Sequence, residues 1–165
     1  MESLINYLIF ILPCYVANAS PVIFKNIIPM KTPIDRGKNF IDGKRILGDG
    51  KTIEGFIIGT LVGSFIGFIL VLLKMHNYIS VVLLSLGAMT GDCIGSFLKR
   101  RLGIPRGKPL PLVDQLTFVI IALLMCSTIT YIPPLYYLYA ILITPPLHLG
   151  SNYVAYLLKL KEVPW

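Results

Sequence analysis

Residues 55–73 read GFIIGTLVGSFIGFILVLL, a run that contains no charged side chain. About 20 apolar residues in a helix, each rising about 1.5 Å, cross the roughly 30 Å hydrocarbon core of a bilayer. This run therefore predicts a transmembrane helix. Its glycines recur every four residues, at Gly55, Gly59, Gly63 and Gly67, and so form a stripe of small residues on one helix face.

A second stripe, Gly87, Gly91 and Gly95, follows in the next apolar run. In lipid, small residues at this spacing let two helix backbones approach closely. We expect the two stripes to pack on each other or on a neighbouring helix of the same chain. A homodimer through one stripe is the alternative.

Four further apolar runs, residues 4–24, 79–98, 112–132 and 135–158, have the length of membrane spans. The chain of 165 residues is 55% hydrophobic, a content that soluble domains rarely reach because their surfaces are largely polar. The sequence therefore predicts an all-α integral membrane protein with five transmembrane helices and one domain, residues 1–165. Glu2 replaces the basic region of a signal peptide, so we expect the first run to be retained as a span. The three cysteines, Cys14, Cys93 and Cys126, have no C-x-x-C spacing and are predicted to be small core residues.

Five spans place residues 25–54, residues 99–111 and the C-terminal tail on one side of the membrane. Because positive residues favour the cytoplasmic side, we predict an outside N-terminus, a cytoplasmic C-terminus and two long cytoplasmic loops in a multi-pass protein of the cell membrane. This distribution, and not nucleic-acid binding, explains the net charge of +7. Only Lys74 lies on the other side; the remaining positive residues are Lys25, Lys31, Arg36, Lys38, Lys44, Arg45, Lys51, Lys99, Arg100, Arg101, Arg106, Lys108, Lys159 and Lys161.

Residues 91–115 read GDCIGSFLKRRLGIPRGKPLPLVDQ and combine two carboxylates with many positive charges. Asp92 lies inside a predicted span, where a charge costs roughly 2.5–3.5 kcal/mol, so we expect it to be functional. Ser96 and Lys99 or Arg100 follow on the same helix face, and Asp114 opens the next span from the same side. Two carboxylates beside cations suit Mg²⁺, which takes one or two carboxylates and completes its shell with phosphate oxygens and water. The alternative is a network of Asp with Lys or Arg that only holds helices together.

The loop before the second span contains GKT at residues 50–52. A Walker A motif would need glycine at position 45, which is Arg45, and a strand before the loop, so that motif is excluded. Gly48, Gly50 and Lys51 still offer backbone N–H groups and a charge just before a predicted helix N-terminus, a favourable position for phosphates. The alternative is a plain polar loop in which Thr52 caps the helix.

Residues 144–146 read TPP and are expected to break or kink the fifth span. His148, Ser151 and Asn152 follow, and a polar cluster that covers freed carbonyls is favoured over a ligand or a base. His76, in a short outer loop, is expected to be solvated and without a role.

The combination of motifs resembles the archaeal CDP-archaeol synthases and, more distantly, the phosphatidate cytidylyltransferases. The matching segments are GDGKTIEG at residues 48–55, the run at 91–115, and an ending that contains Pro146, His148, Asn152, Ala155, Tyr156, Lys161, Pro164 and Trp165. The resemblance implies a Mg²⁺-dependent enzyme that transfers CMP from CTP to 2,3-bis-O-(geranylgeranyl)-sn-glycerol 1-phosphate.

By the same resemblance, Asp92 and Asp114 hold the metal, and the triphosphate or the lipid phosphate is contacted by Lys99, Arg100, Arg101 and Lys108. We predict catalytic roles for Asp92, Asp114, Lys99 and Arg100, and substrate binding by Lys51, Thr52, Gly50, Ser96, Arg101, Lys108 and Gln115. The expected partners are CTP, the isoprenoid ether lipid phosphate and membrane lipids, with no nucleic acid. Two other functions stay open: a polyprenol kinase that uses CTP, and a small membrane transporter with Asp92 on its ion path.

Overall fold

The computed structural model describes residues 2–164 and contains five helices, so the all-α prediction is confirmed. Three of them, α1, α2 and α3, are long and apolar enough to cross a membrane. No strand forms in the described part; two isolated β-bridges lie in the loop of residues 25–52. The helices are α1 Glu2–Phe24, α2 Ile53–Leu72, α3 Tyr78–Arg101, α4 Val113–Ser127 and α5 Pro134–Leu157.

Helix α4 is shorter than the predicted span of residues 112–132. Its 15 residues cover only about 22 Å at 1.5 Å each. The hydroxyls of Ser127 and Thr128 donate to the carbonyls of Leu124 and Met125, both at 2.7 Å. These bonds satisfy carbonyls of the last turn and compete with continuation of the helix.

Helix α5 is continuous from Pro134 to Leu157, so of the break or kink expected at Pro145 and Pro146 the break does not occur. Each proline lacks an N–H group, which removes one helical hydrogen bond apiece. The flanking residue Thr144 is buried and shares a hydrogen bond of 2.8 Å with Tyr15 of α1. This tertiary contact holds α5 against α1 at the point where its own bonds are missing.

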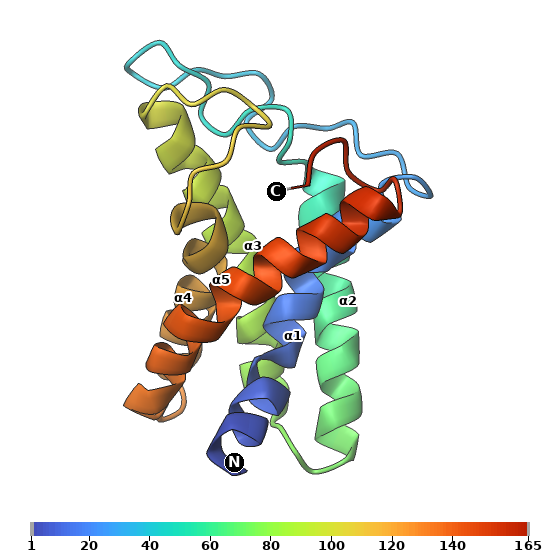
Figure 1. Ribbon diagram of the computed structural model, residues 1–165, viewed down its shortest axis with the longest axis vertical. Coiled ribbons are helices and arrows are strands. Elements are labelled where there is room, and N and C mark those ends of the chain that lie inside the picture. The colour runs from blue at the N-terminus through green and yellow to red at the C-terminus, as the bar shows by residue number, and fades with distance from the viewer. Residues whose placement is uncertain (1, 165) are drawn as a thin grey trace.

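The long connections gather at one end of the molecule. Figure 1 shows the loop of residues 25–52, the loop of residues 102–112 and the C-terminal segment at one end, with the N-terminus and the two short turns at the other. This is the arrangement that antiparallel helices with alternating short and long connections predict. It brings the charged segments of the sequence together.

Both glycine stripes pack inside the chain, as expected, although not on each other. A Cβ at Gly63 of α2 would lie 2.7 Å from the carbonyl oxygen of Pro13 in α1. A Cβ at Gly91 of α3 would lie 2.5 Å from the carbonyl oxygen of Thr117 in α4. Since both stripes are covered within the chain, a homodimer would have to use another surface.

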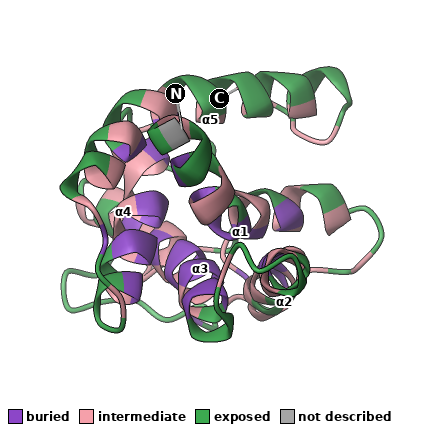
Figure 2. Cartoon of the chain, turned by 90° about the horizontal axis from the view of Figure 1, so that it is seen from below, coloured by how far each residue is buried: buried purple, intermediate pink, exposed green. Residues whose placement is uncertain are grey.

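The core lies where α1, α3 and α4 face one another, as the buried residues in Figure 2 show. Cys14 and Cys126 belong to it, which confirms their predicted role as small core residues. His76 differs from the prediction: its Nε2 is 3.0 Å from the carbonyl oxygen of Phe10, and its ring stacks on the Phe10 ring at 5.0 Å. It therefore ties the turn between α2 and α3 to α1.

Candidate active site

A cavity of about 1340 Å³ opens between the helices at the end where the long loops meet. Six Lys or Arg side chains and three Asp side chains line it, together with apolar residues of α1 and α5. An excess of cations in a partly apolar cavity suits a polyanionic ligand that also has an apolar part. The predicted site residues that line it are Gly50, Lys51, Thr52, Asp92, Lys99, Lys108, Asp114 and Gln115.

Each of the two predicted metal ligands lies beside a lysine. Lys51 forms an ion pair with Asp92, and Lys99 Nζ lies 2.8 Å and 3.0 Å from the carboxylate oxygens of Asp114. The carboxylates keep 32% and 28% of their side-chain surface exposed. The pairs hold the loop of residues 25–52 against α3, and α3 against α4, so the alternative of a helix-pinning network is part of the structure.

A strained turn positions Asp114 at the start of α4. Leu112 has φ 65 and ψ −45, and the N–H of Val113 donates to the carbonyl of Pro111 at 2.8 Å. These are the features of the rare classic γ-turn. The Asp114 carboxylate then accepts the N–H of Leu110 at 2.9 Å, and the Gln115 side chain accepts the N–H of Leu112 at 3.2 Å. The first turn of α4 is therefore fixed by the side chains that face the cavity.

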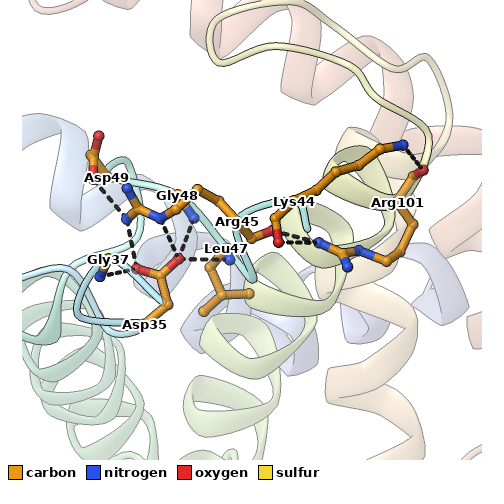
Figure 3. A network of polar contacts seen from close by, with 8 residues as sticks. All are labelled: Asp35, Gly37, Lys44, Arg45, Leu47, Gly48, Asp49 and Arg101. Carbon is orange, nitrogen blue, oxygen red and sulfur yellow. Dashed lines mark hydrogen bonds and ion pairs between the residues drawn. The ribbon is translucent and has the colours of Figure 1, made fainter. Parts of the chain in front are cut away.

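Asp35 organises the loop of residues 25–52, a role that the sequence analysis missed. Its side chain is fully buried and accepts hydrogen bonds from the N–H groups of Gly37, Leu47 and Gly48, at 3.1, 2.9 and 2.8 Å. Arg45 adds a charged hydrogen bond of 2.7 Å, and Figure 3 shows Asp35 at the centre of these donors. Burial alone would raise the pKa of Asp35, but Arg45 and the three amides outweigh it and hold that pKa well below its usual range.

The Asp35 network fixes the residues just before α2. The N–H of Gly48 donates to Asp35, and three residues later the carbonyl of Lys51 accepts from the N–H of Ile34 at 2.9 Å. Thr52 caps α2 by accepting the N–H of Gly55 at 3.1 Å. Thr52 therefore caps the helix, as one of the two interpretations expects, and it also lines the cavity. The only sequence signal for Asp35 was a glycine two residues later, which is typical of a turn closed by an aspartate side chain.

Arg101 lies outside the cavity lining, in contrast to its predicted role in substrate binding. Its guanidinium stacks between Phe40 and Phe97, at 4.8 and 4.9 Å from the ring centres, and pairs with Asp42. It also donates to the carbonyl of Lys44 at 3.2 Å, while the Lys44 ammonium donates to the carbonyl of Arg101 at 2.8 Å, as Figure 3 shows. Arg101 thus clamps the loop of residues 25–52 onto the end of α3.

Ser96 and Arg100 are also absent from the cavity lining. Arg100 runs beside the loop, where a Cβ at Gly48 would lie 3.9 Å from Arg100 Cδ. Cys93 was predicted to be a core residue, but it lines the cavity next to Asp92 and is only partly buried. Of Asp92, Ser96 and Lys99, which were predicted to share one helix face, Asp92 and Lys99 line the cavity and Ser96 does not. The loop before α2 and α5 form the cavity together with α3.

Several cavity residues were not assigned to the site from the sequence. Asn152 of α5 lies 3.2 Å from His148 Nδ1, and His148 packs against the Phe118 ring at 5.9 Å. Ser151 Oγ donates to the carbonyl of His148 at 3.0 Å, so the three residues form a cluster, but His148 and Asn152 face the cavity and not the carbonyls freed by the prolines. The other polar or charged lining residues missed are Tyr15, Asn18, Lys25, Asp49, Arg106, Thr144 and Lys161.

Comparison with known proteins gives a consistent result over the whole chain. Residues 1–165 match the family model described as CarS-like, CDP-archaeol synthase. The chain is 47% identical over 160 residues to a CDP-archaeol synthase of Pyrobaculum aerophilum, covering 96% of this chain and 97% of that protein. It is 45% identical to a CDP-archaeol synthase of Pyrococcus horikoshii, covering 100% of this chain and 99% of that protein.

A solved structure has the same architecture. It is that of an intramembrane enzyme for archaeal membrane lipids biosynthesis, with a TM-score of 0.79 and 41% sequence identity. The match covers 88% of this chain and 91% of that one. Such coverage includes most of the helices that form the cavity.

Proposed function

Because this chain belongs to the CarS-like CDP-archaeol synthase family, we propose that its cavity transfers CMP from CTP to 2,3-bis-O-(geranylgeranyl)-sn-glycerol 1-phosphate. The products are CDP-archaeol and pyrophosphate. One observation carries the proposal: two carboxylates, each beside a lysine, share a cavity that also has apolar walls. This combination suits a reaction between a nucleoside triphosphate and a lipid.

The residues present fit a Mg²⁺ ion. Asp92 and Asp114 line the same cavity and keep part of their surface exposed. Among the described residues no group of three His, Cys, Asp or Glu side chains could hold a metal. This donor set suits Mg²⁺, which binds through one or two carboxylates together with substrate phosphates. When bound, Mg²⁺ neutralises charge on the phosphates and polarises the phosphorus that is attacked.

In the proposed reaction a phosphate oxygen of the lipid attacks the α-phosphorus of CTP. The new bond joins that oxygen to the α-phosphorus, the bond from the α-phosphorus to the bridging oxygen breaks, and pyrophosphate leaves with the electron pair. A phosphate monoester has a second pKa of about 6, so the lipid phosphate is mostly dianionic at neutral pH. Its attacking oxygen therefore needs no general base to remove a proton. Lys51, Lys99 and Lys108 supply positive charge that stabilises the negative charge on the phosphates in the transition state.

We further propose that all five helices span the cell membrane, with the N-terminus outside and the cavity open to the cytoplasm. Fourteen of the fifteen Lys and Arg residues fall in the two long loops, the adjoining helix ends and the C-terminal segment, and Lys74 lies at the opposite end. This asymmetry supports the orientation. A cytoplasmic opening would give a soluble nucleotide access to a lipid that stays in the bilayer.

Labelled CTP tests the reaction directly. Purified protein is given Mg²⁺, the ether lipid phosphate and CTP labelled with ³²P at either the α or the γ position. We expect the α label in the lipid product and the γ label in pyrophosphate. Entry of the γ label into the lipid without the α label would contradict the proposal and indicate a kinase.

A further inference from the structure

The chain reverses after α5, and this reversal brings Lys161 to the cavity. Lys159 has φ 57, and the carbonyl of Ala155 accepts the N–H groups of Leu160 and Lys161 at 2.8 and 3.3 Å. A left-handed residue followed by such bonds is a common way for a helix to end. Figure 1 shows the segment turn back from the end of α5. As a result Leu160, Lys161 and Val163 line one side of the cavity.

Lys161 lies among the charged groups of the cavity. The side chain is partly buried, and this burial lowers the pKa of Lys161 although the charge of Asp114 opposes the shift. Lys51 and Lys99 are also close enough for their charges to act on Lys161. An anion beside Lys161 would therefore lie near the carboxylate and lysine pairs.

His148 offers a hydrogen-bond donor in the same half of the cavity. The amide of Asn152 donates to His148 Nδ1, so the neutral ring carries its proton on Nε2. His148 and Lys161 are close enough for the charge of Lys161 to act on the histidine. A cation and a neutral N–H group together can bind a phosphate monoester.

The wall beside these groups is apolar. Lys25 follows α1 directly and Lys161 follows α5 after a short turn, and both line the cavity. The segments that precede them contribute aliphatic side chains to the lining: Val16, Ala19, Val22, Leu147, Val154 and Leu158. We refer to the lining from α1, α5 and the segments that follow them as one half of the cavity, and to the lining from α3, α4 and the loop before α2 as the other half. The first half combines an apolar wall with Lys25, His148 and Lys161, and the second contains Asp92, Asp114, Lys51 and Lys99. The two halves adjoin, because the charges of Asp114, Lys51 and Lys99 act on Lys161.

We propose that Lys161, His148 and Lys25 bind the phosphate of the lipid acceptor, while CTP occupies the half lined by Lys51, Lys99 and the two aspartates. The C-terminal segment then acts as the element that positions the acceptor phosphate for attack on the α-phosphorus. This inference rests on the proposed cytidylyltransferase activity and assigns the second substrate of the same site.

The test compares two lysines of one segment. Lys161→Gln removes a charge from the cavity, and Lys159→Gln removes the same charge from an exposed position outside the cavity lining. The KM for the lipid phosphate and the KM for CTP are measured separately in mixed micelles. Equilibrium dialysis with labelled CTP and Mg²⁺ reports nucleotide binding without turnover and also shows that each variant is folded.

For Lys161→Gln we expect the KM for the lipid to rise about 10- to 100-fold, the loss typical of a hydrogen bond to a charged group. The KM for CTP and the dialysis result should stay within about twofold, a change worth only about 0.4 kcal/mol. Lys161→Arg should recover most of the lipid affinity, and Lys159→Gln should behave as the wild type. His148→Gln should repeat the defect for the lipid without one for CTP.

Two results would overturn the assignment. A rise in the KM for CTP in place of that for the lipid would put Lys161 in the nucleotide half, and unchanged constants for both substrates would remove it from the site. Both results require a wild-type enzyme that incorporates the α label. A wild-type enzyme that does not incorporate it would contradict the proposed function itself, so the two failures are distinguishable.

Discussion

Gly91→Ala adds one methyl group where α3 meets α4, next to the predicted metal ligands. The new Cβ would lie 2.5 Å from the carbonyl oxygen of Thr117 and 2.6 Å from Phe118 Cα. Both are backbone atoms of α4, so no side chain can rotate away. Because carbon atoms in contact stay about 3.5 Å apart, α4 must retreat by about 0.9 Å at this point.

This displacement acts directly on the two carboxylates. Asp92 follows Gly91 in α3, and Asp114 lies three residues before Thr117 in α4. Overpacking of this kind typically costs about 1–3 kcal/mol of stability. A misplacement near 1 Å can lower a rate by about 100-fold, so we expect turnover to fall by about 10- to 100-fold.

The assay measures incorporation of label from α-³²P-CTP and thermal unfolding in detergent for the same preparations. Gly150→Ala is the matched control, because a Cβ there meets nothing within 4 Å. That variant should keep wild-type turnover and gain about 0.5–1 kcal/mol, since alanine is favoured over glycine in a helix. Wild-type turnover in Gly91→Ala, or an equal loss in Gly150→Ala, would refute the link between the spacing of α3 and α4 and the site.

Three further predictions address the site and its loop. Asp92→Asn should abolish turnover and weaken binding of Mn²⁺, measured by electron paramagnetic resonance as a substitute for Mg²⁺, while the protein stays folded; near-wild-type Mn²⁺ binding would remove Asp92 from the metal site. Asp35→Asn should lower protection from hydrogen exchange in residues 35–52 and raise the KM for CTP. Because the pKa of Asp35 is depressed in the folded protein, the stabilisation of the loop by the Asp35 carboxylate is complete above about pH 4, the pKa of an aspartate in an unfolded chain. This stabilisation is lost as the pH falls from there toward the pKa of the folded protein. Equal protection of residues 35–52 from hydrogen exchange at low and at neutral pH in the wild type would contradict this role. A small thiol reagent should modify Cys93 and inactivate the enzyme, with CTP and Mg²⁺ protecting it, since Cys14 and Cys126 are fully buried; modification of Cys93 that CTP with Mg²⁺ does not slow would place this residue outside the nucleotide half.

The helices were predictable because each is a long apolar run. A membrane span has to satisfy its backbone hydrogen bonds internally, so length and hydropathy are sufficient to locate it. The two errors have local causes. The end of α4 depends on hydroxyl groups of Ser127 and Thr128 that bond to the last turn, and α5 stays helical past two prolines where Thr144 meets Tyr15.

Part of the site was predictable for a similar reason. Asp92 lies in the second half of α3 and Asp114 opens α4. Because these two helices are consecutive and antiparallel, the two acidic residues were expected near the same end of the molecule. The lysines that pair with these two carboxylates could not be predicted in the same way. Lys51 meets Asp92 across 41 residues of sequence, and this contact depends on the loop that Asp35 folds.

The individual contacts of the positive residues could not be predicted from the sequence. For membrane topology, fourteen lysines and arginines on one side are equivalent, because only their side matters. In the structure they divide by what they contact: Arg101 stacks on two phenylalanines outside the cavity, whereas Lys51 and Lys99 pair with carboxylates inside it. Lys159 and Lys161 are separated by a single residue and are equivalent as topology signals, yet of the two only Lys161 lines the cavity. Charge position along the sequence therefore predicts the side of the membrane, and the contacts of each charge depend on the backbone that turns it toward or away from the cavity.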